Sequence, residues 1–251
     1  MDRPPQGAAE FRRVRDLIGS MPLSLVLAWL VHLYTALGAV IAFATVLCIE
    51  EKLFQQAFWL MFLAVAVDAT DGTLARALRV KELIPWFDGD RLEDIVDYAN
   101  YVIVPAHFLV RSELLPRQDA LWLAALPLLA SAYGFSHKEA KTTDHFFRGF
   151  PSYWNIVVFY FYVLQTPRWV NAFAVIILSI LVFVPVKYIY PSRSPLYRGL
   201  TNGLGILWGV SLLLMIHLLA QPPPTLVVAS LAFPIYYTLL SLWLEWRRVS
   251  L

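Results

Sequence analysis

Apolar residues run in long stretches along most of the chain and are separated by short polar segments. The stretches lack the alternation of half-buried strands, and those of about 20 residues are long enough to cross a bilayer as helices. The pattern predicts an all-α fold, a polytopic integral membrane bundle of about eight transmembrane helices. The predicted spans are residues 21–49, 54–78, 92–110, 119–135, 152–166, 169–188, 199–219 and 225–244.

Composition agrees with a membrane protein. Charged residues are 15% of the chain and the mean hydropathy is +0.61, whereas soluble domains contain about 25% charged residues. We expect a single membrane domain over residues 1–251, with a basic N-terminus at residues 1–20. The single cysteine, Cys48, excludes an intramolecular disulfide, and the scattered Lys and Arg argue against a nucleic-acid surface.

The distribution of basic residues predicts the orientation. Eight spans place both termini on one side of the membrane, and 16 of the 20 Lys and Arg fall on that side. Because cytoplasmic loops carry the excess of Lys and Arg, this side is predicted to be the cytoplasm. The segments concerned are the two termini and the loops at 76–91, 137–149 and 187–198.

Acidic residues interrupt the predicted helices between residues 54 and 110. A carboxylate inside a span costs about 2.5–3.5 kcal/mol at the bilayer centre, so it needs a functional reason. Asp68 and Asp71 share one helix face, as do Glu93 and Asp97, and four acids converging from two helices favour a hard divalent cation. The alternative is a structural cluster that arginines neutralise, with Arg76, Arg79 and Arg91 available.

Neighbouring residues bear on this interpretation. Asp94 lies next to Glu93, but the helical register favours Glu93 as the ligand. Gly72 and Gly89 lack side chains where the phosphates of a ligand could approach the backbone.

The spacing resembles the signature of the CDP-alcohol phosphotransferase family, D-x2-D-G-x2-A-R followed by G-x3-D-x3-D. Glu93 stands where the family has Asp, and the gap of twelve residues before Gly89 is longer than in most members. Residues 80–87 and 144–155 resemble the bacterial branch that makes phosphatidylcholine. The matching residues of the signature are Asp68, Asp71, Gly72, Ala75, Arg76, Gly89 and Asp97.

The resemblance implies a metal-dependent phosphatidyltransferase. Its substrates would be CDP-diacylglycerol and choline, its products phosphatidylcholine and CMP, and its cofactor Mg²⁺ or Mn²⁺. Asp97 would be both a metal ligand, beside Asp68, Asp71 and Glu93, and the general base. A homodimer in the bacterial inner membrane is implied, with the active site facing the cytoplasm. The residues expected at CDP-diacylglycerol are Gly72, Ala75, Arg76, Gly89, Arg193 and Arg198; the last two could equally be topology determinants.

Choline is a quaternary ammonium ion, which proteins bind with aromatic faces and nearby negative charge. Tyr153 and Trp154 are the preferred candidates, with Glu139 and Asp144 completing the site. Interfacial Tyr and Trp are expected in any membrane protein. Further aromatic candidates are Trp86, Tyr98, Tyr101, Phe146 and Phe147.

His32 and Thr35 stand where many family members have Asn-x-x-Thr. A helix-packing hydrogen bond is the expected role of His32, with ligand contact as the alternative.

Two other functions remain open at this point. The same fold could use another acceptor, such as serine, inositol phosphate, glycerol phosphate or ethanolamine. An ion-coupled transporter could use the same acids, although their position at one membrane face argues against a path across the bilayer.

Overall fold

The computed structural model describes residues 22–137, 146–189 and 198–249, which are mainly helical. Two short strands, β1 (Phe146–Arg148) and β2 (Lys187–Ile189), form an antiparallel pair. The helices are α2 (Leu23–Glu50), α3 (Phe54–Ala77), α4 (Val80–Leu83), α5 (Gly89–Tyr98), the π-helical turn η1 (Ala99–Ile103), α6 (Val104–Arg111), α7 (Ala120–Ser136), α8 (Trp154–Val163), α9 (Arg168–Phe183), α10 (Arg198–His217), α11 (Pro224–Ser230) and α12 (Ala232–Val249).

The predicted helical membrane fold is confirmed. Four helical segments are long and apolar enough to cross a bilayer, and α7, α8 and α9 are shorter apolar helices. Helices α5, η1 and α6 follow one another without a break, as the span at 92–110 predicted. The four long segments are Leu23–Glu50, Phe54–Ala77, Gly199–His217 and Pro224–Trp246.

Two predicted spans differ from the structure. Helix α8 has 10 residues, which is about 15 Å of helix against a hydrocarbon core of ~30 Å, so it does not cross a bilayer by itself. The span at 169–188 ends early, because α9 stops at Phe183 and Lys187–Ile189 is a strand. Pro185 explains the end of the helix, since a residue that precedes proline is driven out of the helical region; Val184 is extended, at φ −81° and ψ 122°.

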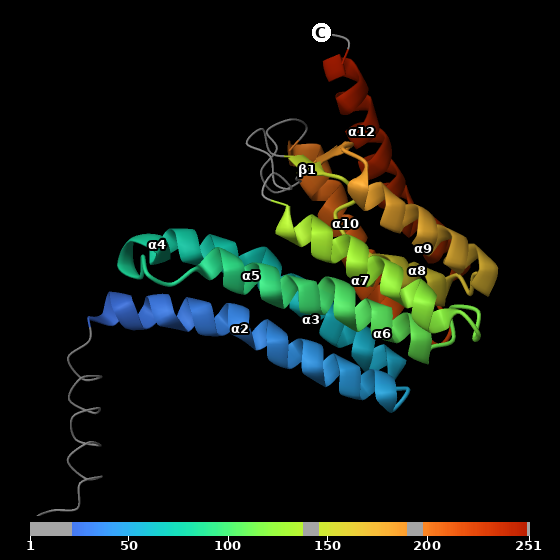
Figure 1. The fold of residues 1–251 in the computed structure, drawn as a ribbon, viewed down its shortest axis with the longest axis horizontal. Helices are drawn as coiled ribbons and strands as arrows, with labels where there is room; N and C mark the ends of the chain where they lie inside the picture. Colours follow the sequence, from blue (N-terminus) through green and yellow to red (C-terminus); the bar gives the residue numbers. More distant parts are fainter. Residues whose placement is uncertain (1–21, 138–145, 190–197, 250–251) are drawn as a thin grey trace, which may run out of the picture.

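Helix α2 packs against both α3 and α5, and Figure 1 shows it running beside α5. The contact with α5 requires a glycine: a Cβ at Gly38 would lie 2.4 Å from Cγ1 of Val96. The Gly38 carbonyl accepts a hydrogen bond from Nδ2 of Asn100 at 2.9 Å. The backbones of α2 and α5 therefore approach closely beside the acidic segment.

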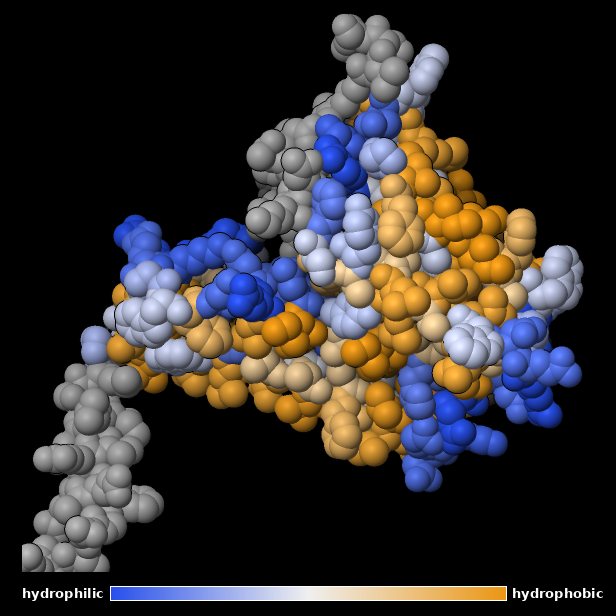
Figure 2. All heavy atoms as spheres, in the orientation of Figure 1, coloured by the Kyte–Doolittle hydropathy of each residue, from blue (hydrophilic) through white to orange (hydrophobic). Residues whose placement is uncertain are grey.

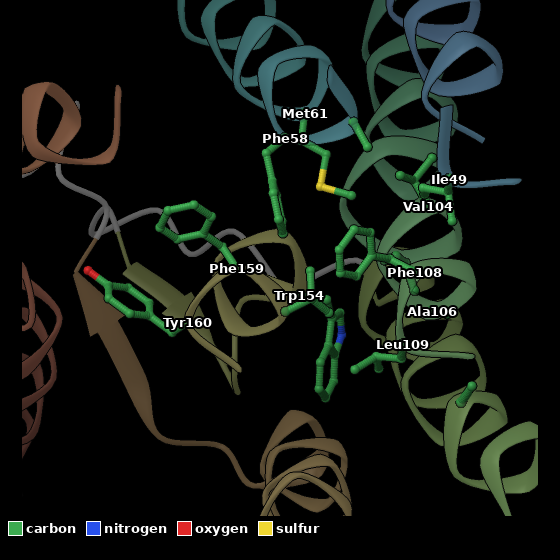
Figure 3. Close-up of a cluster of buried hydrophobic side chains, with 14 of the residues drawn as sticks. Ile49, Phe58, Met61, Val104, Ala106, Phe108, Leu109, Trp154, Phe159 and Tyr160 are labelled. Carbon is green, nitrogen blue, oxygen red and sulfur yellow. The ribbon is translucent and has the colours of Figure 1, made fainter. Parts of the chain in front are cut away.

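An aromatic core joins α3, α6 and α8. Figure 3 shows Phe58, Phe108 and Phe159 pointing into one cluster from these three helices. The ring centroid of Phe58 lies 4.8 Å from that of Phe108 and 5.1 Å from that of Phe159. Ring pairs at such distances contribute about 0.5–1.5 kcal/mol each beyond their burial.

Ion pairs gather where α2, α6 and α9 meet the loops. Nη2 of Arg111 lies 2.6 Å from Oε2 of Glu50, and Nε2 of His107 lies 2.8 Å from Oε1. Glu113 pairs with Arg117 and Arg168. The hydrogen bond from Arg117, together with the charges of Arg117, Arg168 and Lys52, holds the pKa of Glu113 below its usual range.

The pair of strands, β1 and β2, is attached to α12 through β2. The Ile189 amide donates to Oγ of Ser241 at 3.1 Å, and the Tyr237 hydroxyl donates to the Ile189 carbonyl at 2.9 Å. Gly149, with φ +82°, follows β1, and a Cβ there would lie 2.2 Å from the Val182 carbonyl oxygen. This glycine lets the chain turn closely past α9 toward α8.

The outer surface of the helices is apolar. Figure 2 shows hydrophobic residues over α9 and α12, with hydrophilic residues gathered over α4 and α5 and at the loops of the other end. Exposed leucine, isoleucine and phenylalanine side chains on this scale mark a surface that faces lipid.

Gly38 gives a test of the close contact between α2 and α5. We expect Gly38→Ala to lower the melting temperature in detergent by about 2 °C or more, because the added methyl group overpacks against Val96. Gly203→Ala is the matched control, since a Cβ there would meet no heavy atom within 4 Å beyond its own helical backbone and chain neighbours, and alanine favours a helix. Equal melting temperatures for the two variants would contradict the close contact.

Candidate metal centre

Three carboxylates from two helices meet at one point. Asp68 comes from α3, and Glu93 and Asp97 come from α5, one helical turn apart. One carboxylate oxygen of each lies within 4.8 Å of the others, and all three side chains are partly buried. The spacing of four residues on α5 places both of its acids over the same face, toward α3.

This group suits a divalent cation. Like charges this close repel one another, more strongly in a partly buried site than in water. Oxygen ligands are those that Mg²⁺ and Mn²⁺ prefer, so the donor set of three carboxylates fits such an ion. Glu93 belongs to the group and its neighbour Asp94 does not, which is the register that the sequence favoured.

Asp71 lies outside the group of three, although the sequence predicted four ligands. Its side chain is buried, and Oδ2 accepts a hydrogen bond from Oγ1 of Thr35 on α2 at 2.8 Å. A carboxylate has about four lone-pair sites, so this bond leaves acceptor capacity on Asp71. Sequence reasoning did not find the role of Thr35; the signal was a hydroxyl residue within an apolar helix.

Tyr101 is a second partner that the sequence reasoning missed. Its hydroxyl donates to Oδ2 of Asp68 at 2.7 Å, from η1 across to α3. From the sequence alone, Tyr101 is only a further candidate for an aromatic contact with choline. The π-helical turn that places it could have been suspected from Pro105, which interrupts a helical apolar run.

The motif glycines are close to side chains. A Cβ at Gly89 would lie 2.7 Å from Cε1 of His32, and one at Gly72 would lie 3.3 Å from Nη1 of Arg76. The space beside Gly89 is therefore occupied by an imidazole. Arg76 is exposed and donates to Oγ1 of Thr73 at 3.0 Å, while Ala75 packs against the small apolar cluster around Ile84.

His32 packs among aromatic rings, and among the described residues the expected helix-packing hydrogen bond is absent at one of its ring nitrogens. It is 8% exposed and contacts the rings of Trp29 and Phe87. Within the described part of the chain, its Nε2 has no hydrogen-bond partner.

The two preferred choline residues lie in different surroundings. Trp154 is completely buried, and its Nε1 donates to Oγ of Ser131 at 2.9 Å, so its ring faces are covered by protein. Tyr153 is partly buried, and its ring centroid lies 6.4 Å from that of Tyr237. A bound cation could therefore contact the ring of Tyr153, whereas the buried ring of Trp154 is not accessible to it.

The remaining aromatic candidates are spread over the structure. The Tyr98 hydroxyl donates to the Leu128 carbonyl on α7, and Trp86 is 73% exposed. Glu139, Asp144 and Arg193 lie outside the described residues, and so does the side chain of Arg198 at the start of α10.

Comparison with known proteins extends the likeness well beyond residues 68–97. No protein-family model matches the chain. The phosphatidylcholine synthase of Legionella bozemanae is 43% identical over 199 residues, which are 76% of this chain and 90% of that protein. The phosphatidylcholine synthase of Pseudomonas aeruginosa is 35% identical over 227 residues, 90% of this chain and 95% of that protein. That of Borreliella burgdorferi is 38% identical over 179 residues, 71% and 76% of the two chains.

Glu93 and Asp94 form a matched pair for testing the acidic group. We expect Glu93→Gln to weaken Mn²⁺ binding by about 10-fold or more, because even a supporting residue of a metal site has an effect of that size. Asp94→Asn should change the affinity much less, since Asp94 lies outside the group. Titration of the detergent-solubilised protein with Mn²⁺, followed by electron paramagnetic resonance, measures both. The reverse order would place the site one residue further along.

Proposed function

The chain belongs to the phosphatidylcholine synthase family. We propose that it is a membrane enzyme that transfers the phosphatidyl group of CDP-diacylglycerol to choline and releases CMP. The identity to the Pseudomonas aeruginosa protein over 90% of this chain carries the proposal. It extends far past the acidic motif, and the preference for one acceptor alcohol has to be encoded outside a motif that recognises the cytidine diphosphate.

The acidic group would hold the metal ion of this reaction. Asp68, Glu93 and Asp97 would supply one oxygen each, with Asp71 as a fourth ligand from the same helix as Asp68. Mg²⁺ and Mn²⁺ both suit carboxylate ligands. A bound cation would neutralise the diphosphate of the substrate and the departing CMP.

Asp97 would act as the general base. The choline hydroxyl oxygen attacks the phosphorus next to diacylglycerol, and the bond from that phosphorus to the CMP oxygen breaks. The hydroxyl proton passes to the Asp97 carboxylate. A positioned base of this kind contributes about 10²–10⁴-fold to the rate. Asp97 lies one turn after Glu93 on α5, so the base and the metal ligands are held by the same helix.

Tyr153 would contact the choline head group. Tyr153 is the residue just before α8. It lies close enough to Tyr101 for the two side chains to interact electrostatically, and the Tyr101 hydroxyl is hydrogen-bonded to Asp68. An aromatic face beside carboxylates is the environment that a quaternary ammonium ion prefers. Glu139 and Asp144 remain predicted partners of the same ion.

The site would open toward the cytoplasmic half of the inner membrane. The 14 residues from Phe54 to Val67 cover about 21 Å of a hydrocarbon core of ~30 Å, so Asp68 would lie just inside one boundary. The excess of Lys and Arg supports placing that boundary, and both termini, at the cytoplasm. A lipid substrate could then reach the acids sideways from the bilayer. We also propose a homodimer, as the family resemblance implies.

Loss of the base gives the first test of the chemistry. Asp97→Asn should lower CMP release by about 100-fold or more while the protein stays folded. Asp119→Asn, an exposed acid at the start of α7, is the control and should leave turnover unchanged. EDTA should stop the wild-type reaction, and Mn²⁺ or Mg²⁺ should restore it. If Asp97→Asn kept a tenth of the wild-type rate, the assignment of the base would be wrong.

The acceptor is tested with a panel of alcohols. With CDP-diacylglycerol in detergent, choline should turn over fastest, dimethylethanolamine more slowly, and serine not at all. If serine, inositol phosphate, glycerol phosphate or ethanolamine turned over faster than choline, choline would be refuted as the acceptor. The proposed metal site would not be affected.

Tyr153→Ala tests the choline contact itself. One cation–π contact is worth about 0.5–2 kcal/mol, or about 2- to 30-fold in affinity. We expect the KM for choline to rise within that range, with little change in the KM for CDP-diacylglycerol. Tyr133→Ala, a half-exposed tyrosine on α7, is the control. A fall in kcat that disturbs both substrates would indicate lost packing and contradict a choline contact.

A further inference from the structure

The helix that carries Glu93 and Asp97 changes its hydrogen-bond pattern directly after the acids. In η1 the Val104 amide donates to the Ala99 carbonyl, five residues back. Pro105 accounts for this wide turn, because it has no N–H to donate to the Tyr101 carbonyl and its ring would clash with that carbonyl in a regular helix. Single π-helical turns inside α-helices are frequent at functional sites.

The wide turn controls where Tyr101 points. In an α-helix, each step of four residues overshoots a full turn by about 40°, so the face shared by Glu93 and Asp97 drifts with distance. A turn closed over five residues removes this overshoot. The Tyr101 side chain therefore stays over the acidic face and reaches Asp68 on α3, at 2.7 Å.

Asn100 fixes the turn in place. Its Nδ2 donates to the Gly38 carbonyl on α2 at 2.9 Å and to the Val96 carbonyl on its own helix at 3.0 Å. The side chain is buried, where hydrogen bonds that are lost are not replaced by water. The turn is thus held against α2 on one side while Tyr101 is aimed at α3 on the other.

We propose that Tyr101 is a positioning residue that holds the Asp68 carboxylate ready for a cation. The hydroxyl occupies one acceptor site of Oδ2 and orients the carboxylate, which has about four such sites in all. Hydrogen bonds to metal-binding carboxylates orient them in this way, and their loss weakens metal binding about 10- to 100-fold. The inference rests on the proposed cation site, and it assigns to Tyr101 no contact with the substrate or the ion.

Tyr101→Phe removes the hydroxyl and keeps the ring. Tyr98→Phe is the matched control, because Tyr98 lies on the same helix and its hydroxyl donates at 2.8 Å to a backbone carbonyl of α7, away from the acids. For the full-length protein in detergent, three quantities are measured: the Kd for Mn²⁺ by electron paramagnetic resonance, the KM for choline at saturating Mn²⁺, and the melting temperature without metal.

We expect Tyr101→Phe to raise the Kd for Mn²⁺ by about 10-fold or more, with a change below about twofold for Tyr98→Phe. The KM for choline at saturating Mn²⁺ should stay near the wild-type value, and so should the metal-free melting temperature. This pattern separates positioning of a metal ligand from a packing role or a choline contact.

Three outcomes for the variants would overturn the proposal. The first is a Kd for Mn²⁺ in Tyr101→Phe within about twofold of wild type, and the second is an equal change in Tyr98→Phe. The third is a Tyr101→Phe protein that is unfolded or much less stable without metal, because the tyrosine would then serve packing. A wild-type protein that binds Mn²⁺ but prefers another acceptor refutes only the proposed function. A wild-type protein that binds no Mn²⁺ refutes both the proposed function and the role of Tyr101.

Discussion

Acidic side chains held among apolar helices are the constraint on which the rest of this structure depends. Asp68, Glu93 and Asp97 approach one another within 4.8 Å, where their mutual repulsion is only partly screened. The surrounding helices supply donors to the acids of α3: Tyr101 to Asp68, and Thr35 to the buried Asp71. These contacts require α2, α3 and α5 to lie close together. The geometry of this half of the fold therefore follows from the charges it has to accommodate.

The opposite end of the helices contains ion pairs in place of an acidic group. Ion pairs at Glu50 and Glu113 join the ends of α2, α6 and α9, but they are exposed, and such pairs contribute little to stability. The aromatic rings around Phe58 and Phe108 contribute more, because they are buried and in direct contact. A packed core between the two ends can hold the fold together whether or not a ligand occupies the acidic end.

The sequence predicted the parts that depend on local pattern. Long apolar runs located the helices, and the four-residue spacing placed Glu93 and Asp97 on one face. The parts that depend on tertiary contacts were not predicted. An aromatic residue beside a helix start can face inward or outward, so Trp154 could not be recognised as a core residue. The strand at Lys187–Ile189 exists through pairing with a distant segment, and the partner of Asp68 depends on one wide turn.

The π-helical turn also shows how the length of this chain can vary. A wide turn holds one residue more than a regular turn, so the helix after it keeps its direction. Deleting one residue from Ala99–Ile103 would therefore restore a regular helix and leave Phe108 in the aromatic core. Tyr101 would instead lose its place, because the step of four residues from Asp97 would again overshoot a full turn by about 40°. A change of one residue in this helix can therefore remove the contact with Asp68 while the fold around it is kept.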